Sequence, residues 1–232
     1  MDGDARGAYK NTSFDFRQYK KIKMYIHAEK RLQDEELKKG DLTVFVRIGS
    51  DFTRNYYEYE IPLDFTPWYT SSANPDAIWP SDNRMVIDLD KLVQAKQNRN
   101  IAMRQESSNI QLFKRYSEYD GANKITILGN PSFSDVKGIM IGVRNPKRQG
   151  TDLNDDGQSK DAVIWVDELR LTDFNKKPGW AGTGRLEANL NDLGRIMMSG
   201  SFTSAGFGSI DQKINEISQD NLTNYSIATD LD

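Results

Sequence analysis

The residues whose spacing best fits a known chemistry lie in one acidic loop, Asp152-Leu153-Asn154-Asp155-Asp156-Gly157. Alternate oxygen side chains followed by a glycine match the first half of a calcium-binding loop, and the ligands would be Asp152, Asn154 and Asp156. The twelfth position of such a loop carries a bidentate glutamate, but here it is Val163, so Asp161 is the candidate that would complete the site. The sequence therefore predicts a calcium site, with a solvated acidic loop as the alternative.

Paired carboxylates are the second chemistry to test, because glycoside hydrolysis needs two of them facing one cleft. Asp167 and Glu168 are neighbours in an expected strand, so alternation sends them to opposite faces. Glu58 and Glu60 share a face, but we expect water to solvate it. His27 is the one histidine, expected at the surface, and the chain has no cysteine. We therefore predict that the protein is not an enzyme.

Aromatic residues concentrate in the stretch from residue 56 to residue 79. Exposed aromatic side chains of a β-sandwich can stack on the apolar faces of sugar rings, and the candidates are Tyr56, Trp68 and Trp79. The alternative is that these side chains fill the core and cover one of its loops. A carbohydrate-binding module is thus the second functional hypothesis.

Composition excludes two further classes of function. The chain of 232 residues carries a formal net charge of −3, which gives no broad cationic field for nucleic acid. Its mean hydropathy is −0.70, and its longest apolar runs are far shorter than the ~20 residues of a membrane-spanning helix.

An alternation of apolar and polar residues dominates the first part of the chain and predicts strands with one buried face. The three clearest strands, expected to pair as an antiparallel meander, are residues 22–28, 42–48 and 57–63. Further strands are expected at residues 124–128, 138–144 and 162–172. The last contains Val163-Ile164-Trp165-Val166, whose β-forming side chains predict a central strand with Trp165 in the core. One helix is expected after a cap at Asp88 or Asp90, with an irregular segment from residue 98 to residue 109.

The pattern changes after the breaker-rich residues 175–181. Beyond them, short segments alternate small, polar and apolar residues, as strands of outer-membrane barrels do, although a soluble hairpin shows the same pattern. The alternation continues to the last residues, from which we expect a part of a longer protein. The fold class is mainly β: a lead-in (residues 1–13), a jelly-roll-like β-sandwich with one helix (14–174), a hinge (175–181) and a barrel-strand-like tail (182–232).

Several blocks of the sequence resemble the SprA/Sov family, the outer-membrane translocon proteins of the type IX secretion system. These blocks are Met24-Tyr25-Ile26-His27-Ala28-Glu29, Asn55-Tyr56-Tyr57-Glu58-Tyr59-Glu60-Ile61-Pro62-Leu63, Ile139-Met140-Ile141-Gly142-Val143-Arg144-Asn145-Pro146, Trp165-Val166-Asp167-Glu168-Leu169-Arg170-Leu171-Thr172-Asp173-Phe174 and Thr203-Ser204-Ala205-Gly206-Phe207-Gly208-Ser209.

The resemblance implies a non-catalytic segment of a β-barrel that exports folded cargo through the outer membrane and supports gliding motility. The sandwich would then be an insertion between barrel strands, on the periplasmic or the extracellular side, and the tail would lead back into the barrel wall. The implied partners are the rest of the barrel, a smaller outer-membrane shuttle protein, a plug protein and the secreted cargo.

Overall fold

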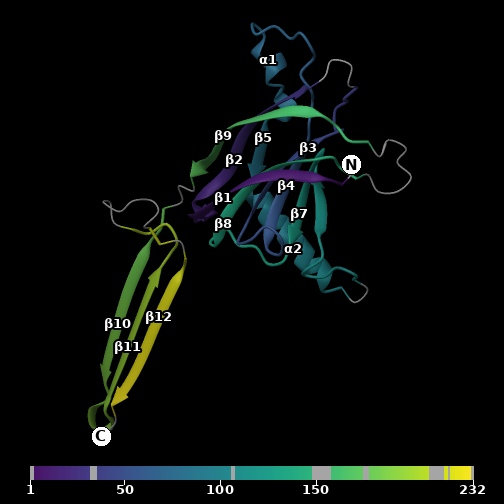
Figure 1. The fold of residues 1–232 in the computed structure, drawn as a ribbon. Helices are drawn as coiled ribbons and strands as arrows, with labels where there is room; N and C mark the ends of the chain where they lie inside the picture. The colour runs from purple at the N-terminus through teal and green to yellow at the C-terminus, as the bar shows by residue number, and fades with distance from the viewer. Residues whose placement is uncertain are drawn as a thin grey trace. The chain divides into compact units, whose positions relative to one another are not determined.

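The computed structural model describes residues 3–31, 36–105, 108–147, 158–174, 178–208, 217–218 and 220–230. The chain divides into two compact units, Met1–Asp173 and Phe174–Asp232, which we call unit 1 and unit 2. Strands dominate both units, as the mainly β prediction requires (Figure 1). No helix in the described part of the chain is long and apolar enough to cross a membrane.

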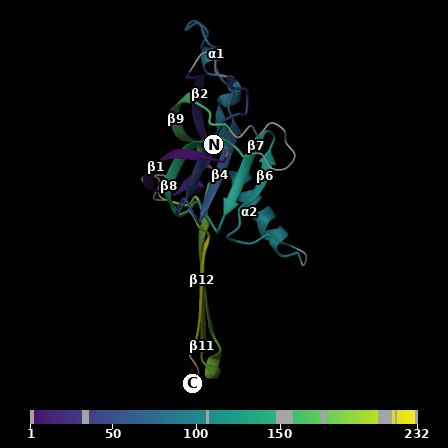
Figure 2. The same ribbon diagram turned by 45° about the vertical axis from the view of Figure 1, so that its right-hand side comes forward.

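The larger sheet of unit 1 has six strands in the order β1-β8-β3-β4-β7-β6. Their bounds are β1 Ala5–Phe14, β3 Thr43–Gly49, β4 Tyr56–Pro62, β6 Tyr116–Asp120, β7 Asn123–Leu128 and β8 Val136–Arg144. All neighbours are antiparallel, and Val46 lies opposite Tyr59 of β4 and Ile141 of β8. This register puts the apolar residues of three strands on one face. Figure 2 shows β1 and β8 at one side of the unit and β7 and β6 at the other.

The smaller sheet of unit 1 has the order β5-β2-β9, with β2 at Tyr19–Lys30, β5 at Met85–Asp88 and β9 at Ala162–Phe174. Every second residue of β2 from Ile22 to Ala28 is at most 2% exposed. These side chains belong to one core with Val44, Val46, Tyr59 and Ile61 of the larger sheet. The two sheets therefore pack face to face, which confirms a β-sandwich.

The expected meander of three strands is wrong in one respect. Strands β3 and β4 are paired, but β2 lies in the other sheet. Alternation determines which face of a strand is buried, and it gives no information on which strand lies alongside.

Three strands of unit 1 are absent from the predictions: β1, β5 and β6. Strand β1 falls mostly in the predicted lead-in, and its Arg6, Lys10 and Asn11 interrupt any apolar alternation. It lies at the edge of the larger sheet, where only one side needs a strand partner, and its bonds to β8 hold it there.

Helix α2 (Leu89–Met103) begins at Asp88, whose carboxylate accepts the backbone N–H of Asp90 at 3.0 Å, as the predicted cap requires. Its buried residues are Leu89, Leu92, Ala95 and Arg99, and it contacts β2, β5 and β7. The fully buried guanidinium of Arg99 donates to the carbonyl of Gly129. This anchoring keeps the helix regular to Met103, into the segment that was expected to be irregular.

In the middle of strand β9, the set of side chains that points to the core switches from even-numbered to odd-numbered residues. Ala162 and Ile164 pack against the core before the change, and Leu171 packs against it afterwards. Even-numbered and odd-numbered residues cannot share a face of a regular strand, so we infer a β-bulge between Ile164 and Leu171. Glu168 has φ +52°, the left-handed conformation that such bulges use.

Trp165 is not in the core, contrary to the prediction. It is 60% exposed, because Ile164 next to it takes the inward position and β9 is an edge strand of the smaller sheet. The apolar run Val163–Val166 predicted a central strand, with a partner strand on each side. Strand β9 has β2 as its partner on one side only.

The turn between β3 and β4 is built on the carboxylate of Asp51. Its Oδ1 accepts the backbone N–H groups of Thr53 (2.8 Å), Arg54 (2.5 Å) and Asn55 (3.2 Å). Burial opposes ionisation of this carboxyl, but the hydrogen bonds outweigh that effect and lower its pKa from 3.8 to about 2.

Unit 2 contains one antiparallel sheet in the order β10-β11-β12. Its strands are β10 Ala181–Asn189, β11 Arg195–Thr203 and β12 Leu222–Asp230, each of nine residues. The middle strand is paired with both neighbours along its whole length.

Replacing Trp165 by alanine should change the free energy of unfolding by less than ~0.5 kcal/mol, since the indole is exposed. Ile26→Ala is the matched control, because Ile26 is 1% exposed in the core and should lose ~2–5 kcal/mol. Urea unfolding of both variants measures the difference. A loss at Trp165 equal to that at Ile26 would place β9 inside the sandwich.

Asp51 should make the stability of unit 1 depend on pH between about 4 and 2. The folded state holds this proton less tightly than the unfolded state, so its contribution is complete above pH 4 and is lost as the pH falls towards 2. Asp51→Ala should flatten the curve of melting temperature against pH in this window. An unchanged slope would contradict the assignment.

Candidate functional site

Three of the four predicted calcium ligands, Asp152, Asn154 and Asp156, lie outside the described residues. The fourth, Asp161, is described, and its carboxylate forms an ion pair with Arg31 (Nη1–Oδ2 3.3 Å). Within the described ranges, no group of three or more His, Cys, Asp or Glu side chains could hold a metal ion. Calcium binding by this loop therefore stays a prediction.

The three predicted sugar-stacking residues do not form one surface. Tyr56 is 1% exposed, and the guanidinium of Arg47 lies 4.0 Å from its ring centroid, so it is wrong as a stacking platform. Trp68 and Trp79 are 43% and 36% exposed. Trp68 packs on Tyr69, whereas Trp79 packs on Tyr25 and His27.

His27 is buried, which corrects its predicted place at the surface. Its Nδ1 lies 2.6 Å from the carbonyl oxygen of Ile78 and 3.1 Å from the hydroxyl of Thr66, and a carbonyl can only accept, so Nδ1 carries the proton. The imidazole thus fastens the segment before Trp79 to β2.

Glu58 and Glu60 are also buried, at 4% and 6% exposed, and not solvated as predicted. Both carboxylates lie on the outer face of the larger sheet and bind arginines of β3, the adjacent strand, and of β8, the strand beyond it. Arg47 Nε donates to Glu58 at 2.8 Å, and Arg144 binds Glu58 at 3.0 Å and also binds Glu60. The hydroxyl of Thr43 donates to Glu60 at 2.5 Å.

This outer-face network is structural in its chemistry. Each carboxylate is bound by a guanidinium, so its oxygens are already engaged in charge-assisted hydrogen bonds. Two neighbouring carboxylates on one strand would repel each other, and the two arginines compensate that repulsion. The predicted antiparallel pairing of β3 and β4 could have indicated the ion pair, because Arg47 lies directly opposite Glu58 in their register.

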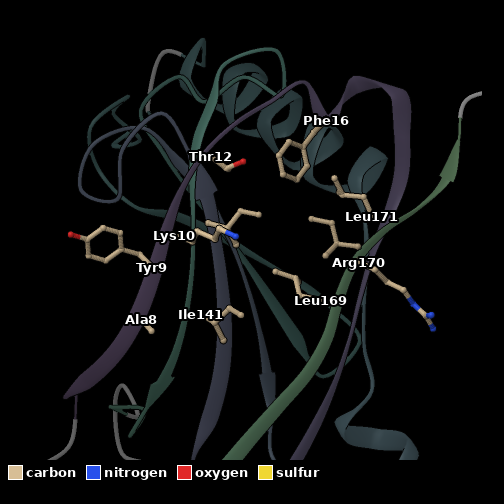
Figure 3. Close-up of a pocket in the computed structure, with 11 residues that line it drawn as sticks. Ala8, Tyr9, Lys10, Thr12, Phe16, Ile141, Leu169, Arg170 and Leu171 are labelled. Carbon is tan, nitrogen blue, oxygen red and sulfur yellow. The ribbon is translucent and has the colours of Figure 1, made fainter. Parts of the chain in front are cut away.

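An apolar cleft opens at the side of the sandwich where β1 and β9, each the last strand of its sheet, lie near each other (Figure 3). Its volume is about 490 Å³, and its lining includes Phe16, Ile22, Ile139, Ile141, Leu169 and Leu171. Lys10 reaches into the space, whereas the guanidinium of Arg170 points away from it. Among the described residues that line this cleft there is no carboxylate or imidazole, so its geometry suits an apolar group and offers no acid–base pair.

Asp167 and Glu168 line one groove together, although alternation had predicted opposite faces. The register change in β9 is the physical reason, because an extra residue redirects the side chains around it.

The sheet of unit 2 has two chemically different faces. One face carries Leu186, Met198 and Ile227 in register across the three strands, together with Phe202 and Tyr225. The opposite face carries Arg185, Ser199 and Ser226 in register, with Glu187 and Arg195 joined by an ion pair (3.3 Å). Met198, Leu186, Ile227 and Tyr225 are between 41% and 83% exposed.

A family model named SprA_N, described as motility related/secretion protein, matches residues 1–232. The chain belongs to this SprA family. A comparison with curated proteins finds none that matches. The match covers both units, so the sandwich and the two-faced sheet are parts of one family module. SprA-family membership makes the chain a motility-related or secretion protein, and the resemblance expected from the sequence is confirmed.

Glu58→Gln should lower the free energy of unfolding by ~3–5 kcal/mol, because it leaves two largely covered arginines, with side chains 12% and 15% exposed, to share one carboxylate. Asp135→Asn is the matched control: its ion pair with Lys137 is at the surface, with side chains 59% and 66% exposed, and should contribute at most ~1 kcal/mol. Denaturant unfolding measures both. Equal small losses would show that the outer-face network does not stabilise the sandwich.

Proposed function

We propose that this SprA-family chain is a non-catalytic structural segment of an outer-membrane translocon for type IX secretion and gliding motility. Unit 2 would form part of the barrel wall, and unit 1 would be a domain, on the periplasmic or the extracellular side, that scaffolds or gates the pore for folded cargo. The observation that carries this proposal is the two-faced sheet of unit 2.

The dimensions of that sheet suit a membrane. A strand that crosses the hydrocarbon layer needs ~9–11 residues, and each strand of unit 2 has nine. The face with Leu186, Met198 and Ile227 would contact lipid, and the face with Arg185 and Glu187 would contact water in the lumen. Trp180 and Phe202 pack together at one end of the sheet, with ring centroids 4.5 Å apart, and barrels place aromatic side chains at the membrane interface in this way.

The non-catalytic role is supported by what holds the charged groups of unit 1. Glu58 and Glu60 are tied to arginines, and the cleft between β1 and β9 is lined mainly by apolar side chains. By the resemblance, the partners would be the rest of the barrel, a shuttle protein, a plug protein and the cargo.

Cysteine labelling in the membrane tests the wall assignment, and the 232 residues contain no cysteine of their own. Single cysteines replace Met198 on the apolar face or Ser199, its neighbour, on the polar face. A water-soluble maleimide should label the cysteine at position 199 and leave that at 198 unlabelled, whereas a lipid-dissolved quencher should reach only a probe at 198. Equal labelling of both positions by the water-soluble reagent would overturn the proposal.

A further inference from the structure

A second groove of unit 1 plays no part in the proposed wall or scaffold. Its volume is about 780 Å³, and it lies between β2, β9 and the segment that contains α1 (Pro75–Ile78). Its lining combines aromatic, basic and acidic side chains, among them Tyr25, Trp79, Arg84, Asp76, Asp167 and Glu168.

The aromatic part of this groove is held in place by the buried side chain of His27. Trp79 is 36% exposed and meets Tyr25 edge to face, with ring centroids 6.5 Å apart and an interplanar angle of 84°. The ring centroid of the buried His27 lies 5.6 Å from that of Trp79. His27 also donates a hydrogen bond to the carbonyl of Ile78, the residue before Trp79. The groove therefore has an indole that is partly exposed and already positioned, which reduces the cost of ordering it on binding.

Donors and acceptors for hydrogen bonds lie around this indole. Arg84 rests over the Tyr25 ring at 5.3 Å and offers guanidinium donors, and Ser81 adds a hydroxyl. The acceptors are three carboxylates, those of Asp76, Asp167 and Glu168. Asp167 also accepts the backbone N–H of Glu168 at 2.8 Å, so the bulge of β9 holds its carboxylate at the groove.

We propose that this groove binds a neutral saccharide chain. The apolar face of a sugar ring stacks on an indole, and sugar hydroxyls both donate to carboxylates and accept from a guanidinium, which this lining provides together. Three carboxylates against one guanidinium repel an anionic polysaccharide. The cationic side chains of a basic peptide would pair with the carboxylates, but they cannot accept from the donors of Arg84 and Ser81.

Binding of defined oligosaccharides to the whole chain tests the proposal. The neutral chains are cellohexaose, laminarihexaose and hexa-N-acetylchitohexaose. Oligogalacturonate is the anionic chain and oligolysine the cationic peptide, and titration calorimetry is the readout. At least one neutral chain should bind with a dissociation constant of about 1 mM or tighter, and oligogalacturonate should not. Binding of oligolysine alone, or of none of the three neutral chains, would overturn the proposal.

Matched variants locate the site. Trp79→Ala should weaken binding about tenfold or more, whereas Trp68→Ala, which removes a comparably exposed indole outside the groove, should leave it unchanged. Asp167→Asn and Arg84→Gln should each weaken binding without removing the indole, and they keep the test valid if Trp79→Ala does not fold. Equal effects of Trp68→Ala and Trp79→Ala, or unchanged binding in all groove variants, would show that the groove is not the site.

Discussion

The packing of β2 against the inner face of the larger sheet is the interaction on which unit 1 depends. Hydrogen bonds join strands within each sheet, but the two sheets are joined through the side chains of one core. Ile22, Met24 and Ile26 supply the central strand of the smaller sheet with its buried face, and their removal from water is the main force that holds the layers together. The bulge in β9 follows from the same requirement, since Leu171 can return to the core only after an extra residue.

The two units use one sequence pattern for two purposes. In unit 1 an apolar face meets a second apolar face and is buried, and even the outer face closes over Glu58 and Glu60 with arginines. In unit 2 the apolar face of the three-stranded sheet is exposed in the described structure. The apolar face of an alternating strand requires an apolar surface to cover it. In the proposed translocon this surface would be the lipid layer.

Alternation was sufficient to predict the strands with a continuous buried face, such as β2, β3 and β4. The predicted cap, Asp88 or Asp90, includes the residue that caps α2. Alternation was insufficient to predict β1, whose lysine and arginine obscure the pattern. It also could not predict which sheet β2 joins. The errors on Trp165, Glu58 and Asp167 share a cause: each depends on a neighbouring strand or on an added residue, which are properties of the assembled sheet. The groove around Trp79 was found only in part, because Tyr25, Arg84 and Asp167 are distant from it in sequence.

The side chain of Lys10 has a consequence for how the edge of the larger sheet behaves. Another strand that added to β1 and closed the adjoining cleft would enclose the ammonium group among Ile139, Ile141 and Leu169, with no carboxylate among the described lining residues to neutralise it. Enclosing a lone charge in this way is unfavourable. A charged side chain at this edge therefore disfavours the addition of another strand to β1.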